Sequence, residues 1–262
     1  MKNAEKAIIK KDIRGITSNK RLFLPLWIVP LMMTVVLPSI FICAVHFATD
    51  DPDVMSLLEL LPESARTGNV ELVIAGMIFN NILPAFFLMI PIMAASIMAA
   101  SAFVGEKEKY TLETLLYCPL SVKEIFRAKV LSSFLLSMFV SLVSFAVMLA
   151  VLELEAVFLM GHPLIPGVGW AIVLFLLSPA VSLIAVTLIV RNSAKAQSVE
   201  ESQQSAVFLI IPVILLVVGQ FAGVMLLNVW ILLGLGVLCA VLAWMLLQRA
   251  VRRFTYEMLL KS

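Results

Sequence analysis

Six runs of mostly apolar residues limit how this chain can fold. A helix rises about 1.5 Å per residue, so about 20 apolar residues are needed to cross the hydrocarbon core of a bilayer. The runs cover roughly residues 22–47, 72–104, 130–152, 169–190, 206–227 and 229–247, and the second begins between 72 and 79. Apolar residues make up 62% of the chain and charged residues 14%, a balance that excludes an ordinary soluble domain. We therefore predict an all-α membrane protein with six transmembrane helices in a single domain over residues 1–262.

Lys and Arg are distributed unevenly among the segments that connect these runs. Seven precede the first run, five lie between the second and third, two follow the fourth and four are in the tail. Only Arg66, of 19 in total, lies in the other set of segments. Because positively charged segments remain in the cytoplasm, we expect both termini to be cytoplasmic. The net charge of +2 is too small to indicate a nucleic-acid partner.

The N-terminal segment, about residues 1–20, carries apolar residues at helical spacing among its lysines. Ile9, Ile13 and Ile16 recur at i, i+4 and i+7. This pattern predicts an amphipathic helix that lies flat in the lipid headgroup layer, with its lysines toward anionic lipid. The alternative is a basic tail without regular structure.

The connection between the second and third runs, residues 105–129, has the pattern of a short helix between two turns. Gly105 is expected to end the membrane helix, and Thr111 can cap a new helix. Pro119 is expected to stop that helix. Its apolar stripe consists of Leu112, Leu115 and Leu116.

A second helix is expected directly after this turn. Ser121 followed by Glu124 is a capping box, so the third membrane helix should begin there. An apolar stripe outside the membrane needs a surface to bury it, either lipid headgroups or a partner protein.

The residues of this connection also form a dense motif. It consists of Gly105-Glu106-Lys107-Glu108, Thr111-Leu112-Glu113, Leu115-Leu116, Pro119 and Lys129. The motif resembles the signature of type-2 ABC exporter permeases, the membrane subunits of two-component exporters. It departs from that signature at Lys109-Tyr110, where Arg-Gly is usual.

The resemblance implies a coupling helix that docks on a separate ABC ATPase subunit, in the cytoplasmic membrane of a prokaryote. The residues that it assigns to this coupling are Gly105, Glu106, Thr111, Leu112, Glu113, Leu115, Leu116 and Pro119. It also implies a smaller ATPase contact at residues 191–205, and pairing with a second permease copy or a paralogue. The sequence has no G-x-x-x-x-G-K-[ST] loop, so ATP and Mg²⁺ are expected on the partner ATPase. The chain itself is expected to hold no cofactor or metal and not to be an enzyme.

Polar residues inside the apolar runs need partners or a cavity. The candidates for a translocation path are Asn80, Asn81, Ser137, Ser141 and Gln220. The alternative interpretation is hydrogen bonding and close packing between helices. Gly219 and Gly223 form a G-x-x-x-G pattern and are a candidate dimer face.

Two other classes of function compete with a permease. A lipid-modifying membrane enzyme would need convergent carboxylates or histidines, and the sequence shows no such motif. A secondary transporter is disfavoured because no ionisable residue is expected at mid-depth in a run and no repeated halves are evident.

Overall fold

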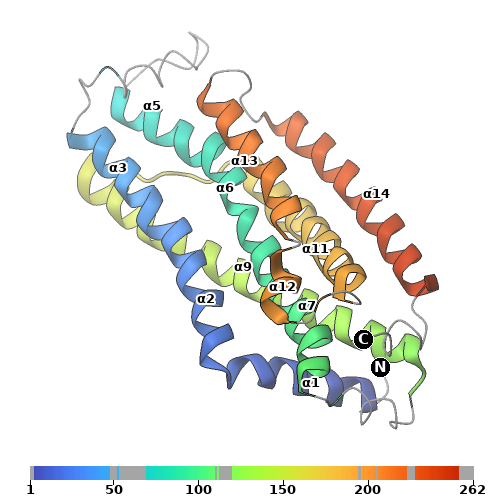
Figure 1. Ribbon diagram of the computed structural model, residues 1–262. Coiled ribbons are helices and arrows are strands. Elements are labelled where there is room, and N and C mark those ends of the chain that lie inside the picture. Colours follow the sequence, from blue (N-terminus) through green and yellow to red (C-terminus); the bar gives the residue numbers. More distant parts are fainter. Residues whose placement is uncertain are drawn as a thin grey trace.

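The computed structural model describes residues 3–47, 52, 69–109, 111, 120–193, 196, 198–204, 206–222 and 228–253, and every regular element among them is a helix (Figure 1). The helices are α1 (Asn3–Thr17), α2 (Lys20–Leu31), α3 (Leu37–Phe47), α5 (Val70–Met77), α6 (Leu83–Phe87), α7 (Met89–Glu108), α9 (Val122–Met160), α10 (Val168–Ile172), α11 (Ser178–Ser193), α12 (Val199–Gln204), α13 (Val207–Phe221) and α14 (Val229–Arg253). Three π-helical turns continue these helices: η1 (Met32–Val36), η3 (Ile78–Ile82) and η4 (Val173–Leu177).

Among the described residues, six helical stretches are long and apolar enough to cross a membrane, which confirms the predicted number. They are Lys20–Phe47, Val70–Glu108, Val122–Met160, Val168–Ser193, Val199–Phe221 and Val229–Arg252. The third stretch exceeds its predicted apolar run by the most residues. It begins eight residues before residue 130 and ends eight after residue 152. It begins at the predicted capping box and ends at Gly161, which adopts the left-handed conformation with φ 73°.

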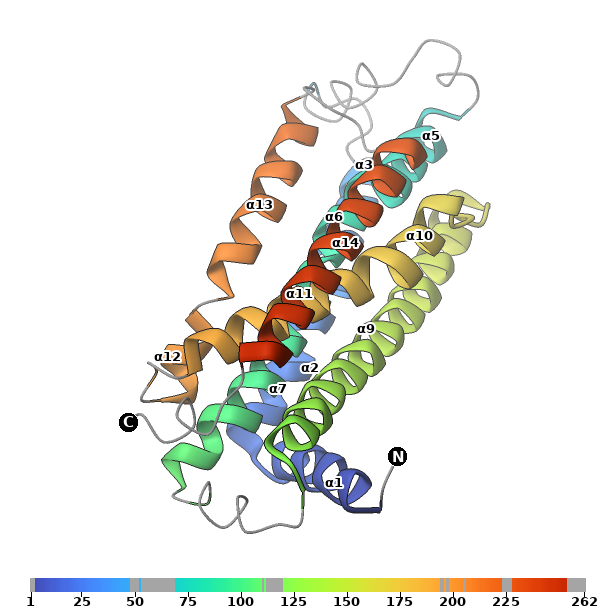
Figure 2. The ribbon, with the colours of Figure 1, turned by 90° about the vertical axis from the view of Figure 1, so that its right-hand side faces the viewer.

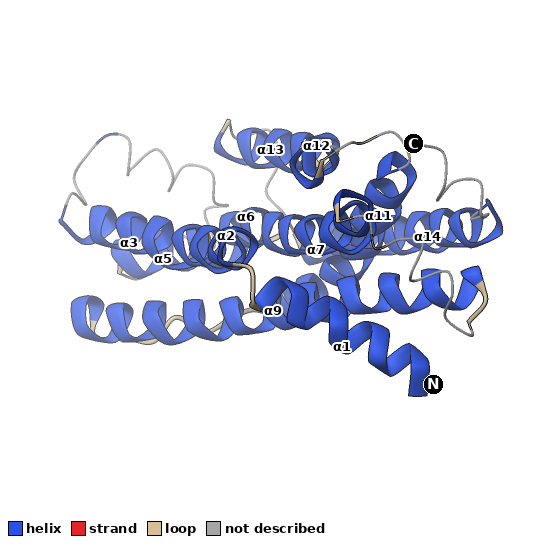
Figure 3. Cartoon of the chain, turned by 60° about the horizontal axis from the view of Figure 1, so that its bottom comes forward, coloured by secondary structure: helices blue, strands red, loops and turns tan. Residues whose placement is uncertain are grey.

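The spans run alternately up and down, and α1 lies across one end of the bundle (Figures 1 and 2). The same end holds the end of α7, the start of α9, α12 and the end of α14. We call it the basic end, because these elements are the ones flanked by most of the Lys and Arg residues. Figure 3 shows α1 on the side of the bundle opposite α12 and α13, where it packs against α9.

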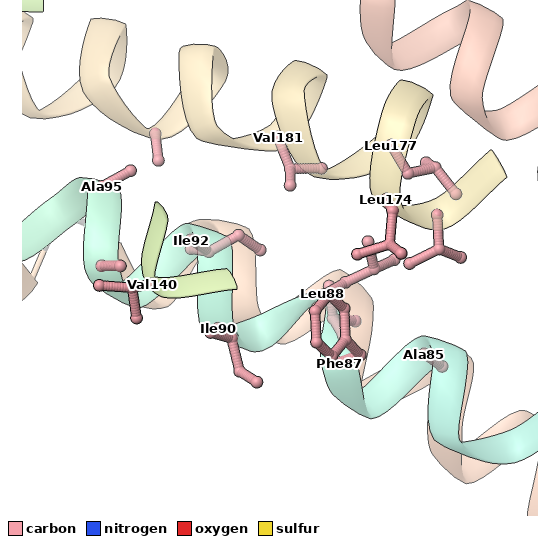
Figure 4. Close-up of a cluster of buried hydrophobic side chains, with 14 of the residues drawn as sticks. Ala85, Phe87, Leu88, Ile90, Ile92, Ala95, Val140, Leu174, Leu177 and Val181 are labelled. Atoms are coloured by element: carbon pink, nitrogen blue, oxygen red, sulfur yellow. The ribbon is translucent and has the colours of Figure 1, made fainter. Parts of the chain in front are cut away.

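The second span is the centre of the fold. Within its most apolar window 83% of the residues are buried, against 17% in the sixth span. Small side chains of α7, among them Ala95, let α9 and α11 approach closely from two sides. Figure 4 shows Val181 of α11 pointing toward the turn of α7 that carries Ile92, with Val140 of α9 beside α7.

Each π turn ends two residues before a proline, and this gives it a physical cause. Leu37, Leu83 and Ser178 each donate their backbone N–H five residues back, and each is followed by a proline. A proline ring clashes with the carbonyl four residues earlier and has no N–H to offer. Widening the preceding turn relieves the clash, but it leaves one carbonyl without a backbone donor.

Two details differ from the sequence predictions. Gly105 does not end the membrane helix: α7 continues to Glu108, and Gly105 is buried where a Cβ atom would lie 3.7 Å from Val199. The N-terminal helix forms as predicted, but its apolar face packs on protein. Ile8 and Ile9 form a buried cluster with Leu120 and residues of α9, so contact with the bundle accounts for this part of the amphipathic pattern, and a position in the headgroup layer stays a prediction.

Candidate functional site

Glu106, in the last turn of α7, is the centre of a cluster of charged side chains at the basic end. It is buried, and its Oε1 atom lies 2.7 Å from Nζ of Lys11 on α1. The same oxygen lies 3.7 Å from Nζ of Lys129 on α9. One carboxylate therefore joins the N-terminal helix, the second span and the third span.

Lys129 is almost fully enclosed, with 2% of its surface exposed. Its ammonium group donates a hydrogen bond to the carbonyl of Ala102 at 2.5 Å and lies over the ring of Phe103. Asp12 of α1 supplies a second carboxylate, with Oδ1 3.6 Å from the ammonium. A buried cation needs such partners, because desolvation alone would cost several kcal/mol.

Both carboxylate oxygens of Asp12 contact side chains of α9. Ser132 donates a hydrogen bond from its hydroxyl to Oδ2 of Asp12 at 3.1 Å. Burial raises the pKa of Asp12, and the neighbouring Lys129 offsets part of that increase. The Asp12 carboxyl therefore binds a proton more readily than a solvated one would.

The cluster reaches the start of the predicted coupling segment through Thr111. The backbone N–H of Thr111 donates to the carbonyl of Glu106 at 3.0 Å, and its hydroxyl donates to the Glu106 carboxylate. The remaining residues predicted for coupling, Leu112, Glu113, Leu115, Leu116 and Pro119, lie outside the described residues, as does the predicted coupling helix.

The connection between α11 and α12 contacts the end of α7. Glu108 accepts a hydrogen bond from the backbone N–H of Val199 at 2.9 Å, which caps the first turn of α12. Lys107 donates to the carbonyl of Ala196 at 3.5 Å. The two segments that the sequence analysis assigns to ATPase contacts therefore meet at the end of α7.

The amide side chains of the candidate path form hydrogen bonds with backbone near the opposite end. Asn80 accepts from the N–H of Gly167 at 2.7 Å and so attaches η3 to the segment before α10. Gln220 of α13, 1% exposed, donates to the carbonyl of Asn81 at 2.6 Å. Its own Oε1 is buried without a partner among the described residues.

A further polar contact satisfies the carbonyl that the π turn η3 leaves free. Leu83 donates to Ile78, and the next position, Pro84, has no N–H, so the Phe79 carbonyl has no backbone donor. The indole N–H of Trp170 donates to this carbonyl at 3.2 Å, and Trp170 is 2% exposed. The sequence analysis did not identify this contact.

Ser137 and Ser141 are fully buried in the face of α9 that packs within the bundle. The Ser137 hydroxyl donates to the Phe134 carbonyl at 2.9 Å, and the Ser141 hydroxyl to the Ser137 carbonyl at 2.8 Å. Both hydroxyls are thus satisfied inside their own helix, an arrangement that allows close packing of small residues.

Gly219 lies on an open part of the α13 surface, because a Cβ atom at this position would meet nothing within 4 Å. Gly223 lies outside the described residues. The first and fifth spans are adjacent here, since the rings of Phe41 and Phe221 stack with centroids 6.1 Å apart.

The sequence analysis did not assign Asp12 or Lys11 to the site. A signal was present, because Asp12 lies four residues from both Ile8 and Ile16 and thus on the face of α1 that the isoleucines occupy. Among the described residues, no group of three or more His, Cys, Asp or Glu side chains is placed to hold a metal ion.

Comparison with known proteins gives a match to a protein family. The family described as ABC-2 type transporter matches residues 3–218, more than half of the chain. The matched range includes α1, the charged cluster and the first four spans. No curated protein and no solved structure matches the chain.

Proposed function

The chain belongs to the ABC-2 type transporter family as a membrane-spanning transport component, and we propose that it is the permease subunit of a two-component exporter. In this proposal a separate ABC ATPase subunit binds ATP and Mg²⁺ and docks at the basic end. That end faces the cytoplasm of a prokaryote, as the distribution of Lys and Arg favours.

The observation that carries the proposal is the position of Glu106. It contacts Lys11 and Lys129. It also accepts a hydrogen bond from Thr111, which is the first residue of the segment expected to dock on the ATPase. A displacement of that segment would act on three elements at once, because a buried ionic cluster resists separation. The coupling segment can therefore move the second and third spans together with α1.

The connection between α11 and α12 extends the proposed docking surface. It is attached to α7 through Glu108 and Lys107. A motor that binds both segments would transmit its movement to the fourth and fifth spans as well. Such linked movement is what alternating exposure of a transport path requires.

We further propose that two permease copies meet along the first and fifth spans. These spans meet where Phe41 stacks on Phe221, and both carry exposed apolar side chains, among them Ile40 and Leu215. The open surface at Gly219 allows a close approach of a neighbouring helix. Most of the candidate path residues form hydrogen bonds within the subunit. We therefore place the path for an amphipathic cargo between the two copies.

Co-purification with the motor tests the proposal. The membrane protein is extracted with its cellular partners, and ATPase activity is measured for the wild type and for a Leu112→Ala, Leu115→Ala variant. Leu154→Ala, an exposed position near the opposite end of α9, is the matched control. We expect an ATPase subunit to co-elute with the wild type and the control, and to be lost or uncoupled in the variant.

Two results would contradict the proposal. If no ATPase accompanies the wild-type chain under any extraction condition, the two-component assignment is wrong. If an ATPase binds and its activity is the same with the double variant, the segment at residues 111–117 is not the coupling element.

A further inference from the structure

A groove at the basic end runs between α9 and α14, with α11 behind it. Its volume is about 490 Å³, within the range of about 300–1,000 Å³ that ligand clefts occupy. Its walls are Val130 and Phe134 on α9, Leu183 on α11, and Trp244 and Leu247 on α14. The groove is thus apolar over most of its length and is formed by three membrane spans.

Two arginines line the same groove near the ends of their helices. Arg127 lies in the second turn of α9, and Arg252 is the penultimate residue of α14. Both side chains are exposed, and neither has a carboxylate within ion-pair distance among the described residues. Among the described residues, the groove therefore presents two guanidinium groups without an ion-pair partner at one end.

Polar and apolar parts of the groove are separated along the helix axes. Phe134 lies seven residues after Arg127, and Trp244 eight before Arg252, so the aromatic side chains are about 10–12 Å farther from the basic end. An occupant that satisfies both parts carries an anionic group joined to a long apolar chain. A soluble anion would leave the apolar walls uncovered, and a neutral apolar compound would leave the arginines unpaired.

We propose that this groove binds one anionic phospholipid of the cytoplasmic leaflet. The phosphate lies between Arg127 and Arg252, where guanidinium groups form charge-assisted hydrogen bonds, and one acyl chain lies along Val130, Phe134 and Leu183. A zwitterionic lipid fits less well, because its own ammonium group opposes the positive field of the arginines. The proposal uses the cytoplasmic orientation proposed above, but not ATPase coupling or the identity of the cargo.

Trp244 in the groove provides a direct test. The full chain is reconstituted in vesicles of phosphatidylcholine with a small, varied fraction of phosphatidylglycerol, and bromine is placed on the acyl chains of one lipid or the other. Bromine quenches a tryptophan that it contacts. The signal of Trp244 is the difference between the wild type and Trp244→Phe, and the signal of Trp230, exposed near the other end of α14, is obtained in the same way from Trp230→Phe.

We expect brominated phosphatidylglycerol to quench Trp244 at a mole fraction about 25-fold lower than brominated phosphatidylcholine, since each of the two arginines near an anionic headgroup contributes about a factor of five. Quenching of Trp230 should follow the bulk lipid fraction. The Arg127→Gln, Arg252→Gln variant should lose the preference at Trp244, whereas Arg249→Gln, one turn from Arg252 and outside the groove, should keep it.

Three results would overturn the proposal. The first is equal quenching of Trp244 by the two lipids, and the second is a preference that survives loss of both arginines. The third is a preference that appears only when residues 254–262 are deleted, because the tail would then be the occupant of the groove. Circular dichroism and gel filtration of each variant establish that the fold is kept, and none of these readouts depends on a partner ATPase.

Discussion

Lys11 and Glu106 are 95 residues apart in the chain, yet their charged groups lie 2.7 Å apart at the basic end of the bundle. Glu106 is buried, and Lys11 is about half exposed. This ion pair attaches α1 to the end of the second span. The same Glu106 oxygen also lies near the enclosed Lys129. Glu106 thus acts first as an anchor inside the permease, and it reaches the proposed docking segment through Thr111.

Replacing Glu106 with Gln should detach this anchor. The change leaves Lys129 with Asp12 as its remaining carboxylate, and breaking a buried ion pair on one side costs about 3–5 kcal/mol. We expect a clear fall in the thermal unfolding temperature in detergent and faster hydrogen exchange of the α1 amides. Glu200→Gln, on the exposed face of α12, is the control, and equal behaviour of the two variants would show that the cluster does not hold α1.

The raised pKa of Asp12 predicts a pH dependence of stability. Because the carboxyl binds protons more tightly in the folded state, the folded state loses stability as pH rises from the ordinary value of 3.8 through the raised value. Asp12→Asn removes this titration. We therefore expect the unfolding temperature of the wild type, measured relative to Asp12→Asn, to decrease with rising pH over that interval. A difference that is constant or increases with pH would contradict the assigned direction of the shift.

The hydrogen bond from Trp170 to the Phe79 carbonyl should depend on Pro84. Trp170→Phe keeps an aromatic ring but leaves that carbonyl unsatisfied, at a cost of about 1–3 kcal/mol. Pro84→Ala restores a backbone N–H and lets the turn close on its own. Unfolding free energies of the two single variants and the double variant form a cycle, and the cost of Trp170→Phe should shrink in the Pro84→Ala background. An unchanged cost would mean that the proline does not free this carbonyl.

Two glycines of α14 should respond to alanine in opposite directions. A Cβ atom at Gly236 would lie 2.5 Å from Cδ2 and 2.9 Å from Cγ of Leu176, so Gly236→Ala should destabilise the contact between α14 and η4 by about 1–3 kcal/mol. At Gly234 nothing lies within 4 Å, and the same substitution should stabilise the helix by about 0.5–1 kcal/mol. Thermal unfolding of the two variants side by side checks the sign of each effect.

The number of spans, the helical class, the capping box at Ser121 and the gathering of basic segments at one end could all be predicted from sequence. Each depends on a property of one short stretch of chain. Examples are the number of consecutive apolar residues needed to cross a bilayer and the three-residue separation of Ser121 and Glu124 in the sequence. The motif at residues 105–129 also indicated the family that the later comparison confirmed.

Contacts between distant segments were decided by the tertiary structure alone. That Asp12 and Glu106 share Lys129, that Trp170 completes the turn before Pro84, and that Asn80 attaches to Gly167 all depend on how each helix is rotated against its neighbours. The apolar length of a run carries little information about that rotation, because most side chains on every face of these spans are apolar. The sequence therefore determined which segments enter the membrane and on which side their charges gather, whereas packing decided which polar groups meet, since each buried polar group must find its partner among whatever the neighbouring helices present.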